Sequence, residues 1–109
     1  MVRSSVVALA ACFVMGVSVS AQDLVARGQK VYVDRKCAVC HSIAGKGNKK
    51  GPLDGVGTKL TADDIRLWMT DAKTMTGKAK ATRKPFMKSY KLSKDDLDAL
   101  VAYMVSLKK

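Results

Sequence analysis

The chain has few of the residues from which metal sites and acid–base active sites are usually built. Its 109 residues include one histidine and three cysteines, and all nine acidic residues are aspartate. Since His41 is the only histidine and Cys12 the only cysteine outside a single pair, a closed zinc site would lack its usual four Cys or His ligands. The Asp63-Asp64 and Asp95-Asp96 pairs stand at the expected starts of helices, where capping and the helix dipole explain them. We therefore expect no catalytic acid or base.

Patterns typical of β-strands are also missing from the chain after residue 21. No alternating or continuously β-branched run appears there. This disfavours a thioredoxin-like protein, because the C-x-x-C of that class lies near a βαβ unit. The segment from Gly55 to Leu60 is superficially similar to a dinucleotide-binding loop, but it lacks a third glycine and a preceding strand. We therefore expect no nucleotide cofactor.

The most specific pattern present is the pentapeptide Cys37-Ala38-Val39-Cys40-His41, because C-x-x-C-H is the attachment signature of c-type haem. In a helical segment Cys37, Cys40 and His41 stand at i, i+3 and i+4 and share one face. Two thiols can then bond to the two vinyl groups of one porphyrin edge while the His41 imidazole reaches the iron. A disulfide between the cysteines would close a very short loop and leave His41 unexplained. The pentapeptide therefore predicts one covalently bound haem c.

The first 21 residues have the organisation of a secretory signal peptide. Arg3 precedes an apolar stretch from Val6 to Val19, and Val19-Ser20-Ala21 places small or β-branched residues at −3 and −1 of a cleavage site. We expect cleavage before Gln22 and export to the periplasm. A retained membrane anchor is the first alternative, although the stretch is shorter than the ~20 residues of a spanning helix. Lipidation at Cys12, within a lipobox-like Leu9-Ala10-Ala11-Cys12, is the second.

Residues 22–109 are enough for one domain, but 88 residues build only a small apolar core, which a buried cofactor would enlarge. Helices are expected from about Leu24 to the haem motif, from Thr61, and from Ser93, the last two beginning with approximate capping boxes. The Thr61 helix should fade between Asp71 and Thr76. The expected inward faces are Leu24, Ala26 to Gly28, Val31 and Tyr32 in the first helix, Ile65, Trp68 and Met69 in the second, and Leu97, Leu100, Val101, Met104 and Leu107 in the last.

Glycine marks two further features. Gly28 inside the first predicted helix costs about 1 kcal/mol relative to alanine, so a close packing partner is the expected reason for it. Between Ser42 and Leu60 the chain has five glycines, and this segment is either an ordered wrap around another surface or a flexible linker.

Together these motifs resemble the class I monohaem cytochromes c, specifically the small bacterial exported type. Besides the haem motif, the resemblance rests on Gly28 and Tyr32, the loop from Gly51 to Gly57, Trp68, a methionine-bearing loop, and the segment from Leu97 to Met104. It covers the whole of residues 22–109. The resemblance implies an all-α cytochrome c fold, with helices wrapped around one haem and the first and last helices crossing. It also agrees with export, because haem is attached outside the cytoplasmic membrane in this family.

The resemblance further implies how the haem is held. The Pro52 carbonyl is expected to accept a hydrogen bond from the ring nitrogen of His41 that does not bind iron, which would orient the imidazole. A tryptophan at the place of Trp68 donates to a haem propionate in related cytochromes. Core packing is an equally good and compatible role for Trp68, since a buried indole needs an acceptor.

Six methionines compete for the second axial position of the iron. Four are set aside, because they leave with the signal peptide or fall on expected helix faces (Met1, Met15, Met69 and Met104). Of the two expected in loops, Met87 is preferred over Met75, because Pro85 to Tyr90 looks like the methionine loop of the family. The family more often has Met-Pro here, so Lys88 is a departure. Met87 opposite His41 would fill both axial positions and favour the ferrous state.

The net positive charge of the chain indicates which kinds of partner it could bind. Removal of Arg3 with the signal peptide leaves nineteen basic residues against nine acidic ones, a formal +10. Lysines cluster on both sides of the expected iron ligands, at Lys46, Lys49 and Lys50, at Lys73, Lys78 and Lys80, and at Lys84, Lys88 and Lys91. They are either a merely solubilising surface or a docking ring for redox proteins with acidic patches. Nucleic acid is a poor fit because aromatic and basic residues are not interleaved, and membrane contact is at most peripheral.

The sequence therefore predicts an exported one-electron carrier that serves a dehydrogenase, a cytochrome complex or a terminal oxidase. Two rival functions remain open. One is a dedicated cytochrome subunit of an oxidoreductase, such as one that oxidises sulfite, thiosulfate or an alcohol. The other is a haem-based gas sensor or a peroxidase, which would need a weak or absent sixth ligand.

Overall fold

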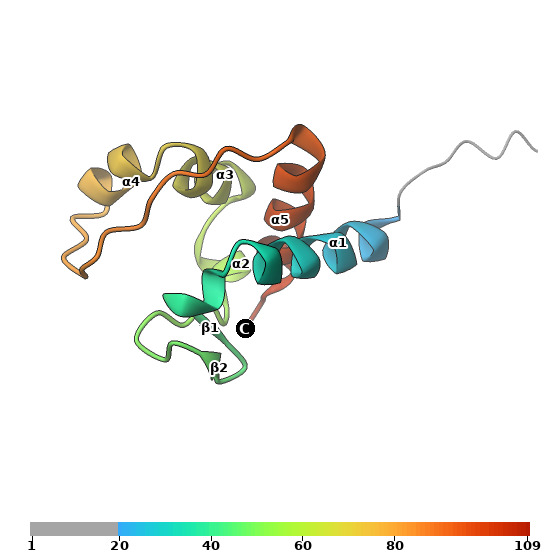
Figure 1. The fold of residues 1–109 in the computed structure, drawn as a ribbon, viewed down its shortest axis with the longest axis horizontal. Helices are drawn as coiled ribbons and strands as arrows, with labels where there is room; N and C mark the ends of the chain where they lie inside the picture. Colours follow the sequence, from blue (N-terminus) through green and yellow to red (C-terminus); the bar gives the residue numbers. More distant parts are fainter. Residues whose placement is uncertain (1–19) are drawn as a thin grey trace, which may run out of the picture.

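The structure, a computed structural model, describes residues 20–109. In this part of the chain, helices account for most of the fold and a two-stranded sheet for little of it (Figure 1). In chain order the elements are α1 (Ala21–Asp34), the 3-10 helix η1 (Cys37–Val39), β1 (Ser42–Ile43), β2 (Lys46–Gly47), α2 (Val56–Lys59), α3 (Ala62–Thr70), α4 (Ala72–Lys78) and α5 (Lys94–Ser106). The expected all-α fold is confirmed.

The predicted signal peptide, Met1 to Ala21, lies outside the described residues except for its last two, and Cys12 lies outside them too. Ser20 caps α1, because its Oγ accepts a hydrogen bond from the Asp23 amide at 3.2 Å. Cleavage before Gln22 and the domain limits 1–21 and 22–109 stay predictions. Among residues 20–109, no helix combines the length and the apolar character needed to span a membrane.

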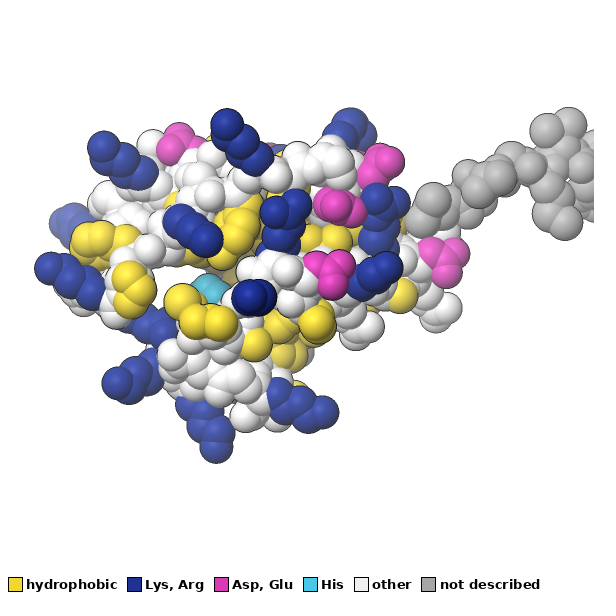
Figure 2. All heavy atoms as spheres, in the orientation of Figure 1, with side chains coloured by type: hydrophobic (Ala, Val, Ile, Leu, Met, Phe, Trp, Pro, Cys, Tyr) yellow, Lys and Arg dark blue, Asp and Glu magenta, His cyan; other side chains and the backbone are white. Residues whose placement is uncertain are grey.

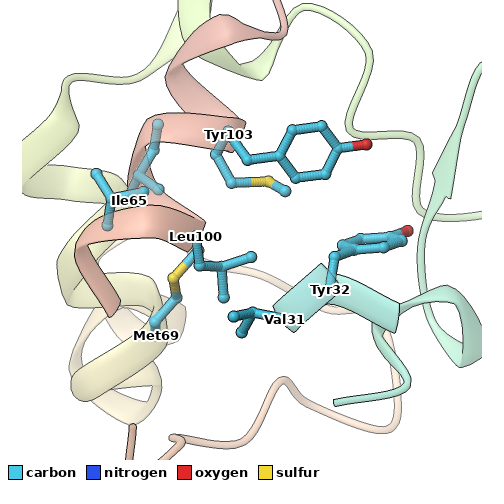
Figure 3. Close-up of a cluster of buried hydrophobic side chains, with 8 residues drawn as sticks. Val31, Tyr32, Ile65, Met69, Leu100 and Tyr103 are labelled. Carbon is cyan, nitrogen blue, oxygen red and sulfur yellow. The ribbon is translucent and has the colours of Figure 1, made fainter. Parts of the chain in front are cut away.

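Helices α1 and α5 cross, as expected, and Gly28 lies at the crossing point (Figure 1). A Cβ atom on Gly28 would overlap the backbone of Ala99 and approach the Cβ of Tyr103 to 2.6 Å. The absence of a side chain on Gly28 therefore lets the two backbones touch. Beside this contact the rings of Tyr32 and Tyr103 pack edge to face, with centroids 5.9 Å apart and planes at 81° (Figure 3).

The starts of two helices follow the capping prediction. Thr61 accepts a hydrogen bond from the Asp64 amide at 3.1 Å, and Ser93 accepts one from the Asp96 amide at 3.1 Å. The aspartates in these first turns also complement the helix dipole. Both expected helices begin where the sequence places them.

The Thr61 helix ends near Asp71, as expected, but the sequence did not predict the helix that follows it. Helix α3 ends at Thr70, but α4 begins at once and runs from Ala72 to Lys78. The helix exists because it buries Ala72 and Met75, and tertiary burial outweighs the modest helix propensities of its threonines.

The glycine-rich segment from Ser42 to Leu60 is ordered and lies on other parts of the fold. Strands β1 and β2 form an antiparallel pair, and Ser42 also makes a parallel bridge with Pro52. Helix α2 packs against α5, and a Cβ on Gly57 would overlap the backbone of Val105. The ordered-wrap interpretation of this segment is therefore correct.

The core is small and lies between α1, α3 and α5 (Figure 3). Its buried members are Val31, Tyr32, Ile65, Met69, Leu100, Val101, Tyr103 and Met104. The expected inward face of α5 is correct, but that of α1 is too wide: Ala26 and Arg27 are exposed and Leu24 is half-buried. Helix α1 packs mainly against α5, so its buried residues are Gly28, Val31 and Tyr32.

Candidate functional site

The pentapeptide from Cys37 to His41 forms a single helical turn after α1. Lys36 adopts a left-handed conformation (φ 57°) that ends the path of α1 and starts η1. The amides of Cys40 and His41 both donate to the Cys37 carbonyl, at 3.1 and 3.0 Å. This turn gives the i, i+3, i+4 spacing that places both thiols and the imidazole on one face.

One cavity of about 500 Å³ brings this face together with side chains from the rest of the chain. Cys37, Cys40 and His41 line it, and apolar side chains from α3 and α5, among them Ile65 and Leu100, supply much of the remaining wall. Its volume lies in the range typical of cofactor sites. Figure 2 shows the face where it opens: the histidine is visible in a hollow bordered by apolar and basic side chains.

The imidazole of His41 is held by the glycine-rich loop. Its Nδ1 lies 3.0 Å from the Gly51 carbonyl oxygen, and because a carbonyl can only accept, Nδ1 is the donor and carries the proton. The Nε2 lone pair is then available to a metal. Burial lowers the pKa of His41, and the charge of Arg83 acts in the same direction, while the bond to Gly51 opposes both. The ring is thus kept neutral, as a metal ligand must be.

The acceptor of this hydrogen bond is Gly51, so the prediction that it is the Pro52 carbonyl is wrong. The parallel bridge explains the difference of one residue. The Ser42 amide donates to the Gly51 carbonyl at 3.0 Å and the Leu53 amide donates to the Ser42 carbonyl at 2.8 Å, which turns the Gly51 carbonyl toward His41. Pro52 itself is exposed.

The two cysteines are free thiols, each half-buried at the wall of the cavity. Burial is the main cause that raises the pKa of Cys37, and the neighbouring Cys40 adds to it. The Cys37 thiol is therefore neutral at pH 7. Both thiols remain available for bonds to a group within the cavity.

Met87 and Met75 are placed very differently. Met87 is half-buried, lies in the segment between α4 and α5, and lines the cavity. Met75 is buried in α4, so its expected place in a loop is wrong, and it is not among the residues that line this cavity. Met69 and Met104 line the cavity as members of the core.

The segment that carries Met87 is fixed at its far end. The Tyr90 amide donates to the Met69 carbonyl at 2.7 Å, and the Ser89 hydroxyl accepts from the Ala72 amide at 3.0 Å. These bonds tie the segment to α3 and to the first turn of α4. Met87, two residues before Ser89, is thereby held close to the wall of the cavity.

Polar atoms around the cavity are left without partners in residues 20–109. The hydroxyl groups of Tyr32 and Thr76 are both buried there with no hydrogen bond, and both residues line the cavity. Trp68 lines it as well and is half-buried. An apolar wall with a few unpaired polar groups suits a large, mostly apolar group that carries some polar substituents. The donors present therefore fit a haem held by two thiols and an imidazole.

Arg83 belongs to this site and had no sequence signal of its own, because it stands among many basic residues. It comes from the Met87 segment and lines the cavity. A Cβ on Gly51 would overlap its guanidinium group, with the Cζ atom at 3.1 Å. Only its spatial position against Gly51 distinguishes it from the neighbouring lysines.

Comparison with known protein families gives one match: the model of the family described as cytochrome c matches residues 25–108. The matched region contains the haem motif and every residue that lines the cavity. No curated protein and no solved structure gives a match.

Proposed function

Because the chain belongs to the cytochrome c family, which binds haem c covalently, we propose that it is a one-electron carrier with His41 and Met87 as iron ligands. Cys37 and Cys40 tether the haem in this proposal. The observation that carries it is the meeting of these four side chains in one cavity. Met75, the alternative ligand in the sequence, is buried in α4 and lines no part of this cavity.

Each of these residues has a separate task. The haem supplies a one-electron couple at its iron. His41 presents Nε2, because Gly51 holds the proton of the ring on Nδ1. Met87 supplies a soft, neutral thioether, which favours the reduced state. His41 and Met87 would both hold the iron, the haem would then supply outer-sphere electron transfer, and Trp68 would form part of the apolar wall around it.

The rim of the cavity is suited to docking a protein partner. Phe86 and Val39 are large apolar side chains with 51% and 69% of their surface exposed, and each stands next to residues assigned to the haem. Lys84 and Lys88 stand before and after Phe86 and Met87 in the chain. The Lys84 Nζ lies 5.9 Å from the centre of the Phe86 ring, and the Lys88 Nζ lies 5.3 Å from the centre of the Tyr90 ring. Apolar contact surrounded by positive charge favours a partner with an acidic patch around an apolar centre.

The proposal also includes export of the protein to the periplasm. The apolar stretch from Val6 to Val19 and the Val19-Ser20-Ala21 cleavage site support secretion, and the periplasm is where the carrier would meet its donors and acceptors. We place the mature N-terminus at Gln22.

The test uses the wild-type protein produced in a host that attaches haem. A carrier should show a reversible one-electron couple, and its reduced form should not bind carbon monoxide, because no coordination position is open. Ready binding of carbon monoxide, or turnover of peroxide, would identify a sensor or a peroxidase. Stable co-purification with a larger chain would identify a dedicated subunit of an oxidoreductase.

A further inference from the structure

Arg83 connects the Met87 segment to the loop that holds His41. A Cβ atom on Gly51 would overlap the Arg83 guanidinium group, with the Cζ atom at 3.1 Å, and it would also overlap the backbone carbonyl of Cys40. The carbonyl of the same Gly51 accepts the hydrogen bond from His41 Nδ1. Gly51 is therefore in contact with both Arg83 and the His41 imidazole.

The charge of Arg83 has no acidic partner within residues 20–109. The ion pairs of this part of the chain involve Arg27, Arg66 and Lys94, which pair with Asp96 or Asp98. Arg83 donates no hydrogen bond to these acids.

We propose that Arg83 is a positioning residue that favours the reduced protein, because it places an unpaired positive charge against the Gly51 peptide that holds the His41 ring. This inference rests on the proposed function. Reduction brings one electron from a donor to the site and lowers its net charge by one. A fixed positive charge nearby is therefore more favourable in the reduced state than in the oxidised state. Since Arg83 is exposed, solvent screens part of this effect.

The test measures the equilibrium constant for reduction of the haem-loaded protein by a reference couple at low ionic strength. Arg83→Gln should lower this constant about three- to tenfold relative to wild type, which is about 30 to 60 mV at 59 mV per tenfold. Arg83→Lys keeps the charge and should stay within about twofold of wild type. Because Arg83 is exposed, both variants should fold.

Arg66→Gln is the matched control, because Arg66 lies on α3, lines no part of the cavity and pairs with Asp98 at 2.9 Å. Its equilibrium constant should stay close to that of wild type. An effect of Arg83→Gln no larger than that of Arg66→Gln would overturn the proposal. A loss in Arg83→Lys equal to that in Arg83→Gln would also overturn it, since packing rather than charge would then be responsible. The sulfur-to-iron band of wild type, measured first, tests the ligand proposal independently.

Discussion

Gly28 of α1 lies directly against Tyr103 of α5, so that a Cβ on Gly28 would be only 2.6 Å from the Tyr103 Cβ. Gly28→Ala should therefore destabilise the protein, although alanine gains about 1 kcal/mol over glycine in a helix. Overpacking costs about 1 to 3 kcal/mol, and here the overlap includes the backbone of Ala99. We expect a net loss of up to about 2 kcal/mol in the free energy of unfolding, measured by urea denaturation.

Gly77 in α4 is the control for this change, because a Cβ there would meet nothing within 4 Å. Gly77→Ala should stabilise the protein by up to about 1 kcal/mol. If both substitutions stabilise the protein, the crossing of α1 and α5 is looser than the structure indicates.

Tyr32 makes stability depend on pH in the alkaline range. Burial of its unpaired hydroxyl is the main cause that raises the pKa of Tyr32 to about 12, above its usual value. The folded state therefore holds the proton more tightly than the unfolded state. The stability from this group is fully present below about pH 10, where the unfolded chain is still protonated, and is lost as pH rises through about 12.

Tyr32→Phe removes this titration. Between about pH 9 and pH 11, wild type should lose about 1 kcal/mol more free energy of unfolding than the variant, measured by urea denaturation at each pH. At pH 7 the two should be similar, because the hydroxyl has no hydrogen bond within the described residues. Identical pH dependence in the two proteins would show that Tyr32 ionises as easily when folded as when unfolded.

Substitutions that remove the sulfur atom but keep the side-chain volume can show whether Met87 or Met75 is the iron ligand. Met87→Leu should open the iron to carbon monoxide, abolish the sulfur-to-iron charge-transfer band and lower the reduction potential. Met75→Leu should leave all three unchanged, because Met75 is buried in α4 and outside the cavity. Visible spectra of the reduced and oxidised proteins decide the question, and the reverse pattern would move the ligand to Met75.

The lysines beside Met87 should control the rate of association with the redox partner. As ionic strength rises from about 0.01 to 0.15 M, the Debye length falls from about 30 to 8 Å, so electron transfer should slow. Replacing both Lys84 and Lys88 with Glu should slow it more than the same change at Lys108 and Lys109, which follow α5. Stopped-flow kinetics measures both effects. A rate independent of salt would mean that docking is apolar.

Local chemistry made parts of the fold predictable. Thr61 and Ser93 cap helices because each needs only an amide three residues away. Two other features could also be predicted from the sequence. The turn from Cys37 to His41 follows from the spacing of the motif, and the packing role of Gly28 follows from the cost of glycine in a helix.

What the sequence did not predict depends on contacts between distant residues. Helix α4 forms because Ala72 and Met75 become buried, which their own segment does not reveal. The acceptor of the His41 bond is Gly51 rather than Pro52 because a bridge with Ser42 sets the register of the loop. Arg83 became distinct from the other basic residues only through its packing on Gly51.

The intact mass of the protein purified from a haem-attaching host tests the central claim most directly. We predict one species, a chain that begins at Gln22 and carries one haem bonded through Cys37 and Cys40, and loss of the haem mass when both cysteines are replaced with alanine. Attachment of a lipid at Cys12 would change only the predicted processing. A mass equal to that of the bare polypeptide, or of the polypeptide with zinc, would contradict the account.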